Sequence, residues 1–298
     1  MELKIGSYTV AITNPEKILF PKDKITKLDL ITYYHDIAPV MFPYLKNRLI
    51  VMLRYPAGID KEGFFHKDAP DYFPSWIKRK SVPKEKGGIV HYVIGSNSAT
   101  MPYLANFGCI TPHIWLSKVD VLHKPDTMIF DLDPDKASFA MVQKVALLLR
   151  DFLIDLKLVP FVKTTGQHGL HVVVPIKRLY DFDTVRACAR AIAQELVNKY
   201  PQMLTLEMRK EKRGNRIFVD FLRNAFGQTA VAPYGVRPHE HAPVAAPIDW
   251  DEVEDKKLIS ARYTIKTIFK RLEKKGDPWE EAYAGGRRSL ATALKLVE

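Results

Sequence analysis

The sequence predicts an α/β or α+β fold built around a mixed β-sheet. Apolar segments of strand length alternate along the chain with longer segments of helical spacing, and turn residues separate them. The chain has 298 residues, of which 47% are hydrophobic, so it can bury a substantial core in one large domain or two closely packed ones. We find no internal repeat and no long Gly/Ser linker.

The first part of the chain is expected to combine strands, one helix and a basic loop. Strands are predicted over residues 2–13 (as a short pair), 48–55 (RLIVMLRY) and 89–94. Thr26 has the side chain of a helix N-cap, and the apolar spacing after it predicts a helix running to Ile37. Residues 78–88 contain many lysines, a proline and two adjacent glycines, which predicts a basic loop.

The second part of the chain has a clearer alternation. Strands are predicted over residues 127–133 (TMIFDLD), 161–163, 170–176 and 217–222 (IFVDFL). Helices are predicted over residues 138–158, 183–200 and, with a basic character, about 255–275. Residues 233–247 are rich in proline and are expected to be irregular.

The charge of the chain points to a polyanionic partner. The formal net charge is +11, which favours nucleic acid or an anionic membrane surface without choosing between them. No segment has the ~18 apolar residues of a membrane span, and the N-terminus lacks a secretory signal, so we expect a cytoplasmic protein without a membrane partner. The two cysteines, Cys109 and Cys188, lie far apart in no metal-binding motif, which makes a structural zinc site improbable.

The most informative segment is the strand that contains Asp131 and Asp133. Side chains two residues apart on a strand project from the same face, so these carboxylates point together while Phe130 and Leu132 enter the core. Two carboxylates on one rigid face repel each other unless a cation lies between them. Magnesium or manganese suits such oxygen ligands. A cap or a surface position is the ordinary alternative for an isolated pair of this kind.

A third carboxylate, Asp220, interrupts another apolar strand. An unpaired charge there would be costly, so we expect Asp220 to face a metal ion or to pair with Arg216 or Arg223. Three carboxylates on two strands form the minimal set for two-metal phosphoryl transfer.

The segment KTTGQHGLH, residues 163–171, predicts a tight turn between two strands. Its glycines allow backbone N–H groups to approach an anion, Thr165 offers a hydroxyl, and His171 starts the next strand. An ordinary hairpin with an exposed histidine is an equally good interpretation of this pattern alone. His113, beside a tryptophan, is more typical of a core residue, and Arg223 and Arg237 could neutralise a triphosphate or lie on the surface.

Together these segments resemble the polymerase domain of bacterial ligase D, in the archaeo-eukaryotic primase superfamily. The resemblance runs from Asn14 to about Trp279, and three segments carry it: IFDLDPD, TGxxGLHVVVP, and FVDFLRNAFGQTAVAPYGVRP over residues 218–238. It implies an α+β fold with a primase-like catalytic core of mixed sheets flanked by helices. It also implies one domain, with an N-terminal DNA-end-binding region (about 1–110), a catalytic core (about 111–250) and a C-terminal helical segment (about 251–298).

The resemblance assigns expected roles to individual residues. The metal-binding catalytic carboxylates are Asp131, Asp133 and Asp220; the nucleotide-binding or site-bracing residues are Thr165, His168, His171, Arg223, Arg237 and His113; the 5′-phosphate-binding residues are Lys17 and Lys27; the template contacts are Arg54, Phe64 and Phe65; and the end-pairing residues are Arg213, Lys84 and Lys86. The family usually has serine at position 165 and lysine at position 168. The second departure puts the affinity for nucleotide in question.

The implied activity is template-directed addition of ribo- or deoxynucleotides to primer 3′ ends at gaps and overhangs, in non-homologous end joining. The resemblance implies two Mn²⁺ or Mg²⁺ ions, a nucleoside triphosphate substrate and DNA with 5′-phosphate ends in a prokaryotic nucleoid. A free-standing form of the domain would also need a separate ligase and the end-binding protein Ku, and would be a monomer unless it dimerises across a break. Two alternatives stay open: a non-catalytic DNA-end bridging module, and a haloacid-dehalogenase-type phosphatase, for which Asp135 is an unusual residue.

Overall fold

The computed structural model describes residues 1–84, 87–280 and 285–297. By internal contacts the chain divides into two compact units, each made of three segments of the sequence. Unit 1 comprises residues 1–120, 229–245 and 263–273, and unit 2 comprises residues 121–228, 246–262 and 274–298. The three consecutive regions expected from the sequence stay a prediction.

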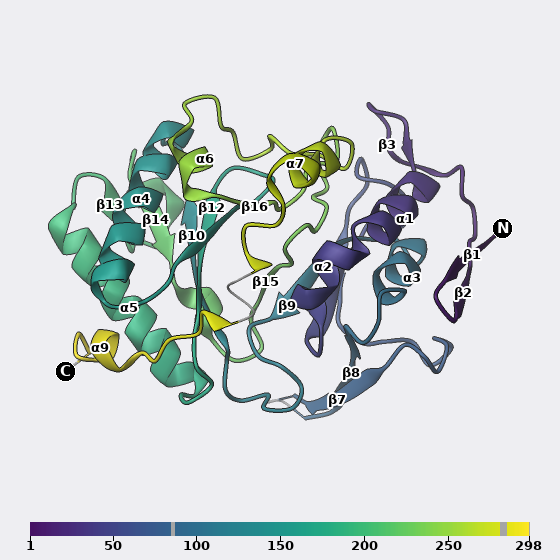
Figure 1. Cartoon of the computed structure of the whole chain (residues 1–298), viewed down its shortest axis with the longest axis horizontal. Helices are drawn as coiled ribbons and strands as arrows, with labels where there is room; N and C mark the ends of the chain where they lie inside the picture. The colour runs from purple at the N-terminus through teal and green to yellow at the C-terminus, as the bar shows by residue number, and fades with distance from the viewer. Residues whose placement is uncertain (85–86, 281–284, 298) are drawn as a thin grey trace. The chain divides into compact units, whose positions relative to one another are not determined.

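Unit 1 contains a six-stranded sheet, two short hairpins and several helices (Figure 1). Its strands are β1 (Glu2–Ile5), β2 (Tyr8–Ala11), β3 (Ile18–Phe20), β4 (Ile25–Thr26), β5 (Leu49–Arg54), β6 (Phe64–His66), β7 (Arg79–Pro83), β8 (Ile89–Ile94), β9 (Cys109–Trp115) and β15 (Thr229–Val231). Its helices are α1 (Lys27–Asp36), α2 (Ala38–Leu45), α3 (Thr100–Asn106) and the greater part of α7 (Ile268–Lys275). The sheet has the order β15-β9-β5-β8-β7, with β6 paired to β5.

Unit 2 contains the second six-stranded sheet and the two longest helices of the described chain (Figure 1). Its strands are β10 (Thr127–Asp133), β11 (Phe161–Thr164), β12 (Leu170–Pro175), β13 (Leu204–Thr205), β14 (Ile217–Asp220) and β16 (Pro247–Ile248). Its helices are α4 (Phe139–Asp155), α5 (Phe182–Lys199), α6 (Trp250–Glu254), α9 (Ala291–Leu294) and the 3₁₀ turns η1 (Lys210–Lys212) and η2 (Leu222–Asn224). The sheet order is β13-β14-β10-β12-β11-β16; only β13 pairs in parallel with its neighbour, so the sheet is mixed.

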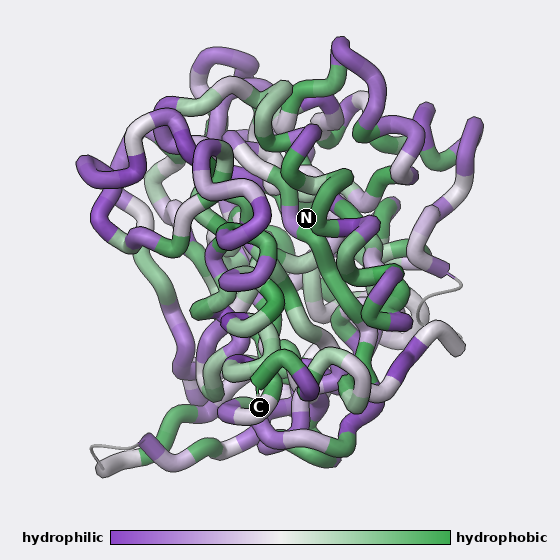
Figure 2. Tube along the Cα trace, turned by 90° about the vertical axis from the view of Figure 1, so that its left-hand side faces the viewer, coloured by the Kyte–Doolittle hydropathy of each residue, from purple (hydrophilic) through white to green (hydrophobic). Residues whose placement is uncertain are grey.

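The predicted elements around the acidic segment are confirmed. Strand β10 lies in the middle of its sheet, and Phe130 and Leu132 are fully buried there. Helices α4 and α5 pack against this sheet, and the side chains of Ser138 and Asp181 cap their N-termini. In Figure 2 the apolar residues lie mostly along inner segments of the trace, and the hydrophilic residues mostly in its outer loops. This packing fixes β10 and its neighbours as a rigid base for side chains at the strand ends.

Two expectations are wrong. Residues 79–83 of the predicted basic loop form strand β7, which pairs antiparallel with β8 at the edge of the sheet. Edge strands commonly carry lysine and arginine, because these charges prevent pairing with a further strand. Here the same charges made the segment look like a loop in the sequence. The basic helix predicted over residues 255–275 begins only at Ile268, because residues 255–262 form successive turns instead.

Candidate active site

The three aspartates lie on two neighbouring strands of unit 2. Strands β10 and β14 are antiparallel, and their register sets Asp131 directly opposite Asp220. Asp133 follows on the same face of β10 and lies opposite Phe218. The structure therefore brings the late aspartate to the early pair, although nearly ninety positions of sequence separate them.

The carboxylate of Asp131 contacts the side chains of Arg223 and His171. The Nε atom of Arg223 lies 3.1 Å from its Oδ2 atom and 3.9 Å from Oδ2 of Asp220, so one guanidinium bridges both carboxylates. The Nε2 atom of His171 lies 3.3 Å from the same Oδ2 of Asp131. His171 reaches this position because β12 pairs with β10 in a register that aligns it with Asp131.

Burial and neighbouring charges shift the pKa values of these groups in different directions. Burial lowers the pKa of His171 to about 4, and the nearby Lys163 adds to this, so the imidazole is neutral at pH 7. Burial alone would raise the pKa of Asp131, but His171 and Arg223 outweigh it and hold the pKa well below its usual range. Since His171 is neutral, Arg223 is the cation that keeps Asp131 ionised. Burial raises the pKa of Asp220, and the charge of Asp131 adds to the shift.

Asp133 has a different partner. The Nη1 atom of Arg213 lies 3.5 Å from the Oδ2 atom of Asp133. The same arginine donates hydrogen bonds to the carbonyls of Glu207 and Met208 at 2.9 and 2.8 Å, and its guanidinium lies 4.0 Å from the centroid of the Phe218 ring. Arg213 is only 4% exposed, so in unit 2 it fixes a loop beside the acidic strands.

The glycine-containing turn between β11 and β12 is tied together by hydroxyl groups. The Thr165 hydroxyl accepts hydrogen bonds from the backbone N–H groups of Gln167 and Gly169 at 3.3 and 3.1 Å. It also lies 3.1 Å from the Ser260 hydroxyl, which donates to the carbonyl of Gly169 at 2.8 Å. The Thr165 hydroxyl thus contacts Gln167, Gly169 and Ser260. Of the two roles expected for Thr165, nucleotide binding and bracing of the site, these contacts fit bracing.

A cavity of about 500 Å³ opens beside this turn in unit 2. Its lining includes Asp133, Gln167, His168 and Lys210, together with the residue Ser260 that braces the turn. A carboxylate, a basic side chain and the residues of a glycine-containing turn thus border one hollow. That combination suits a phosphate group accompanied by a cation.

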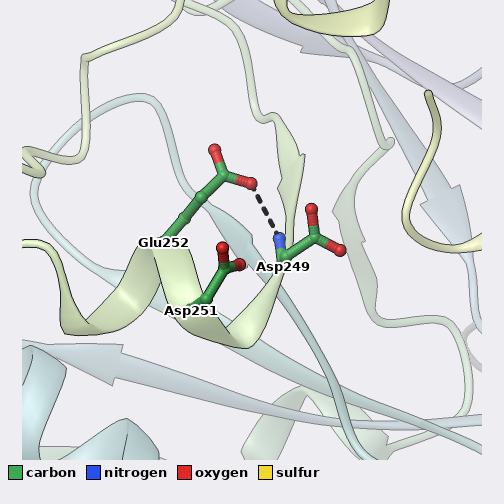
Figure 3. A group of neighbouring side chains, drawn as sticks. All are labelled: Asp249, Asp251 and Glu252. Atoms are coloured by element: carbon green, nitrogen blue, oxygen red, sulfur yellow. Dashed lines mark hydrogen bonds between the residues drawn. The ribbon is translucent and has the colours of Figure 1, made fainter. Parts of the chain in front are cut away.

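The carboxylate oxygens of the three predicted aspartates do not all lie within 4.8 Å of one another. Among the described residues, the group that meets that limit is Asp249, Asp251 and Glu252 at the start of α6 (Figure 3). The Nζ atom of Lys275 lies 3.0 Å from Asp251 and 3.8 Å from each of the other two carboxylates. Asp249 and Glu252 also form a capping box, so this group is a charged helix start with its own counter-ion.

Unit 1 contains the two lysines predicted to bind a 5′-phosphate. Lys27 is 6% exposed, and its ammonium group donates to the carbonyl and, at 3.0 Å, to the hydroxyl of Thr13. Burial lowers the pKa of Lys27, and the charge of Lys17 adds to this. Lys17 is therefore close enough for the two ammonium groups to repel each other. No carboxylate lies within ion-pairing distance of either among the described residues.

The predicted template contacts lie together on β5 and β6. Arg54 pairs in register with Phe64, and the rings of Phe64 and Phe65 are 47% and 57% exposed. His113 on β9 is 8% exposed and meets Phe65 edge-on at 5.2 Å between centroids.

Two of the remaining predicted residues, Arg237 and Lys84, also belong to unit 1. Arg237 has its backbone N–H bonded to the carbonyl of Pro243, and Lys84 lies exposed after β7. Lys86 falls outside the described residues.

Two residues of the site escaped the sequence analysis. Ser260, from the segment mispredicted as helix, reaches the Gly169 carbonyl across 91 positions of sequence. Lys163 is fully buried on β11 and pairs in register with His171. A lysine inside the apolar run FVKT was a signal for Lys163, whereas no local pattern marks Ser260.

Comparison with known proteins identifies the family of the chain. The profile of the LigD primase-polymerase domain matches residues 26–279. The chain is 31% identical over 271 residues to the multifunctional non-homologous end joining protein LigD of Mycolicibacterium smegmatis, covering 90% of this chain and 35% of that protein. It is 30% identical over 284 residues to the bifunctional LigD of Bacillus subtilis, covering 95% and 45%. The chain thus spans less than half the length of these relatives.

A solved structure matches over nearly the whole chain. It is the polymerase domain from Mycobacterium tuberculosis ligase D in complex with DNA, with a TM-score of 0.88 and 29% identity, covering 93% of this chain and 99% of that one. The fold is thus that of an archaeo-eukaryotic primase-like nucleotidyltransferase. The chain belongs to the LigD primase-polymerase domain family.

The family assignment confirms the resemblance, the α+β fold class and the enzyme class, and leaves the phosphatase alternative without support. No helix among the described residues is long and apolar enough to cross a membrane.

Proposed function

We propose that this protein is a template-directed DNA-end-repair polymerase that extends primer 3′ ends at gaps and overhangs in non-homologous end joining. The observation that carries the proposal is the pairing of Asp131 with Asp220 in register, with Asp133 on the same face. This arrangement occurs in a family whose members include end-joining proteins.

The acidic strand ends suit divalent cations. Asp131, Asp133 and Asp220 offer oxygen ligands from a rigid sheet. Burial, and to a smaller extent the charge of Asp131, raise the pKa of Asp220, and a shared cation would offset both effects. These three residues would hold Mg²⁺ or Mn²⁺. When bound, such ions would lower the pKa of the primer 3′-hydroxyl and stabilise charge on the phosphates.

The basic groups around the carboxylates would orient the nucleoside triphosphate. Arg223 already lies between Asp131 and Asp220, where it can compensate the charge of a phosphate. His171 is neutral, so it would act as a hydrogen-bond donor without adding charge. Gln167 and His168 of the turn border the cavity where the outer phosphates would lie. Nucleotide-binding roles are also proposed for Arg237 and His113, which belong to unit 1.

Lys17 and Lys27 would bind the 5′-phosphate at a DNA break. Their mutual repulsion, without an acidic partner among the described residues, would be relieved by a phosphate group. Lys84, Lys86 and the loop fixed by Arg213 would contact a second DNA end. We further propose a preference for ribonucleotides and manganese, a monomer that pairs across a break, and cooperation with Ku and a ligase.

The test is primer extension on a gapped duplex with a 5′-phosphate at the far side of the gap. The assay compares Mg²⁺ with Mn²⁺ and ribo- with deoxynucleotides. We expect metal-dependent, template-matched addition that is weaker when the 5′-phosphate is removed. Binding of the duplex without any incorporation under all four conditions would instead favour a non-catalytic bridging module.

Replacing His168 by lysine is expected to lower the KM for nucleotide, with little change in kcat. His168 lines the cavity beside Asp133, and a permanent ammonium charge there would attract a triphosphate more strongly than an imidazole. Steady-state extension with varied nucleotide measures both constants. His35→Lys, which adds the same charge at a half-buried position of α1 beside Asp36, is the matched control. An equal KM for His168→Lys and the unmodified protein would contradict this role.

A further inference from the structure

Unit 1 exposes one more aromatic ring beside the predicted template contacts. Tyr72 is 72% exposed, more than either Phe64 or Phe65. It lies between β6 and β7, and no role follows for it from the sequence motifs. With Phe64 and Phe65 it is one of several strongly exposed rings in unit 1, and grouped exposed aromatic side chains are suited to contact another molecule.

Tyr72 and Arg54 are joined by a common ring, Phe107. The Arg54 guanidinium lies 3.5 Å from the Phe107 centroid, and its Nε atom donates to the Phe107 carbonyl at 3.0 Å. The Tyr72 ring meets Phe107 edge-on at 6.2 Å and Phe73 edge-on at 5.7 Å. Two edge contacts support the ring of Tyr72 and leave most of its surface open.

The side-chain partner of the Arg54 guanidinium is a neutral histidine. The Nη1 atom of Arg54 lies 2.8 Å from Nδ1 of His66. Burial, together with the Arg54 charge, lowers the pKa of His66, so this histidine accepts the hydrogen bond as a neutral group. No carboxylate lies within ion-pairing distance of Arg54 among the described residues. The nearby Asp71 is directed to Arg79, 3.5 Å away.

An open aromatic ring beside a fixed, uncompensated cation suits a nucleotide. The ring can stack on a base of any sequence, and the guanidinium can attract the adjoining phosphate. A docking site for a protein would also use exposed rings, but it gives no reason for the uncompensated charge of Arg54. The Arg54–Phe64 contact, at 5.3 Å from guanidinium to ring centroid, links this position to the predicted template contacts.

We propose that Tyr72, supported by Phe107 and Arg54, forms a stacking site for an unpaired nucleotide of the template strand, next to the position served by Phe64. The proposal rests on the proposed polymerase function, since it presupposes a template with unpaired bases. It adds a contact that would hold the single-stranded template beyond the nucleotide being copied.

The test measures the affinity of the full chain for primer-template duplexes whose 5′ template overhang grows from one to five nucleotides. For the unmodified protein, we expect one of the added nucleotides to raise the affinity about tenfold. A tenfold gain lies in the weaker part of the range of free energies known for base–aromatic stacking. Tyr72→Ala should lose that step, and Tyr72→Phe should keep it. Replacing the nucleotide at that step by an abasic one should lower the affinity of the unmodified protein as much as Tyr72→Ala does. It should not lower the affinity of Tyr72→Ala any further.

The controls separate this proposal from the function on which it rests. Leu179→Ala removes another strongly exposed apolar side chain, in unit 2, and should leave every affinity unchanged. If the unmodified protein extends primers but Tyr72→Ala shows the same overhang dependence, the stacking site is rejected while the polymerase function stands. If the unmodified protein does not incorporate nucleotides, the polymerase function fails, and the abasic comparison still decides whether Tyr72 stacks on a base.

Discussion

Asp131→Asn is expected to lower the rate of primer extension by at least about a thousandfold, while gapped DNA still binds. Asparagine keeps the size of the side chain and one oxygen that can face His171, but it removes the charge that Arg223 holds in place. Loss of the proposed metal ligand would remove several kcal/mol of stabilisation from the developing charge, and each ~1.4 kcal/mol corresponds to a tenfold change in rate. Single-turnover extension with saturating nucleotide measures the effect.

Asp151→Asn is the matched control for this variant. Asp151 lies exposed on α4 in the same unit, where it pairs with Arg150 at 2.8 Å, so its loss should leave extension unchanged. Fluorescence anisotropy with gapped DNA separates binding from chemistry. If Asp131→Asn extended primers at a rate close to that of the control, Asp131 could not be a metal ligand, and the assignment of the three carboxylates would fall.

The acidic site could be predicted because its signals are local. Alternation along a strand sets Asp131 and Asp133 on one face whatever the rest of the chain does, and an acid within an apolar strand is conspicuous at Asp220. The pairing of the two strands is not local, and the resemblance to ligase D supplied it. The helix start at Thr26 was also predictable, since its capping box depends only on Thr26 and Asp29.

The supporting contacts could not be predicted, because they depend on tertiary packing. Ser260 acts on Gly169 only because residues 255–262 leave helical conformation and pass the turn. Arg213 looks like a surface residue within the basic sequence RKEKRGNR, yet it is buried by Phe218 and by two carbonyl acceptors. Long-range contacts decide both positions, so local composition misleads.

Gly169→Ala is expected to destabilise the protein by about 3 kcal/mol or more and to abolish primer extension. A methyl group on Gly169 would lie 2.1 Å from the carbonyl oxygen of Leu132 and 3.2 Å from its carbonyl carbon. These are backbone atoms of a central strand, so they cannot move aside as a flexible side chain would. Relief of the clash would shift β10 between Asp131 and Asp133, and it would also displace the Gly169 carbonyl from the Ser260 hydroxyl.

Urea unfolding measures the stability of this variant, and Gly227→Ala provides the comparison. A methyl group on Gly227 meets nothing within 4 Å, so its cost comes from the left-handed backbone alone (φ +77°) and should be about 1 kcal/mol. The excess destabilisation of Gly169→Ala over this control is the effect of close packing against β10. Equal stability of the two variants would mean that β10 and the turn can separate without cost, and the acidic strand could then not serve as a rigid base for the carboxylates.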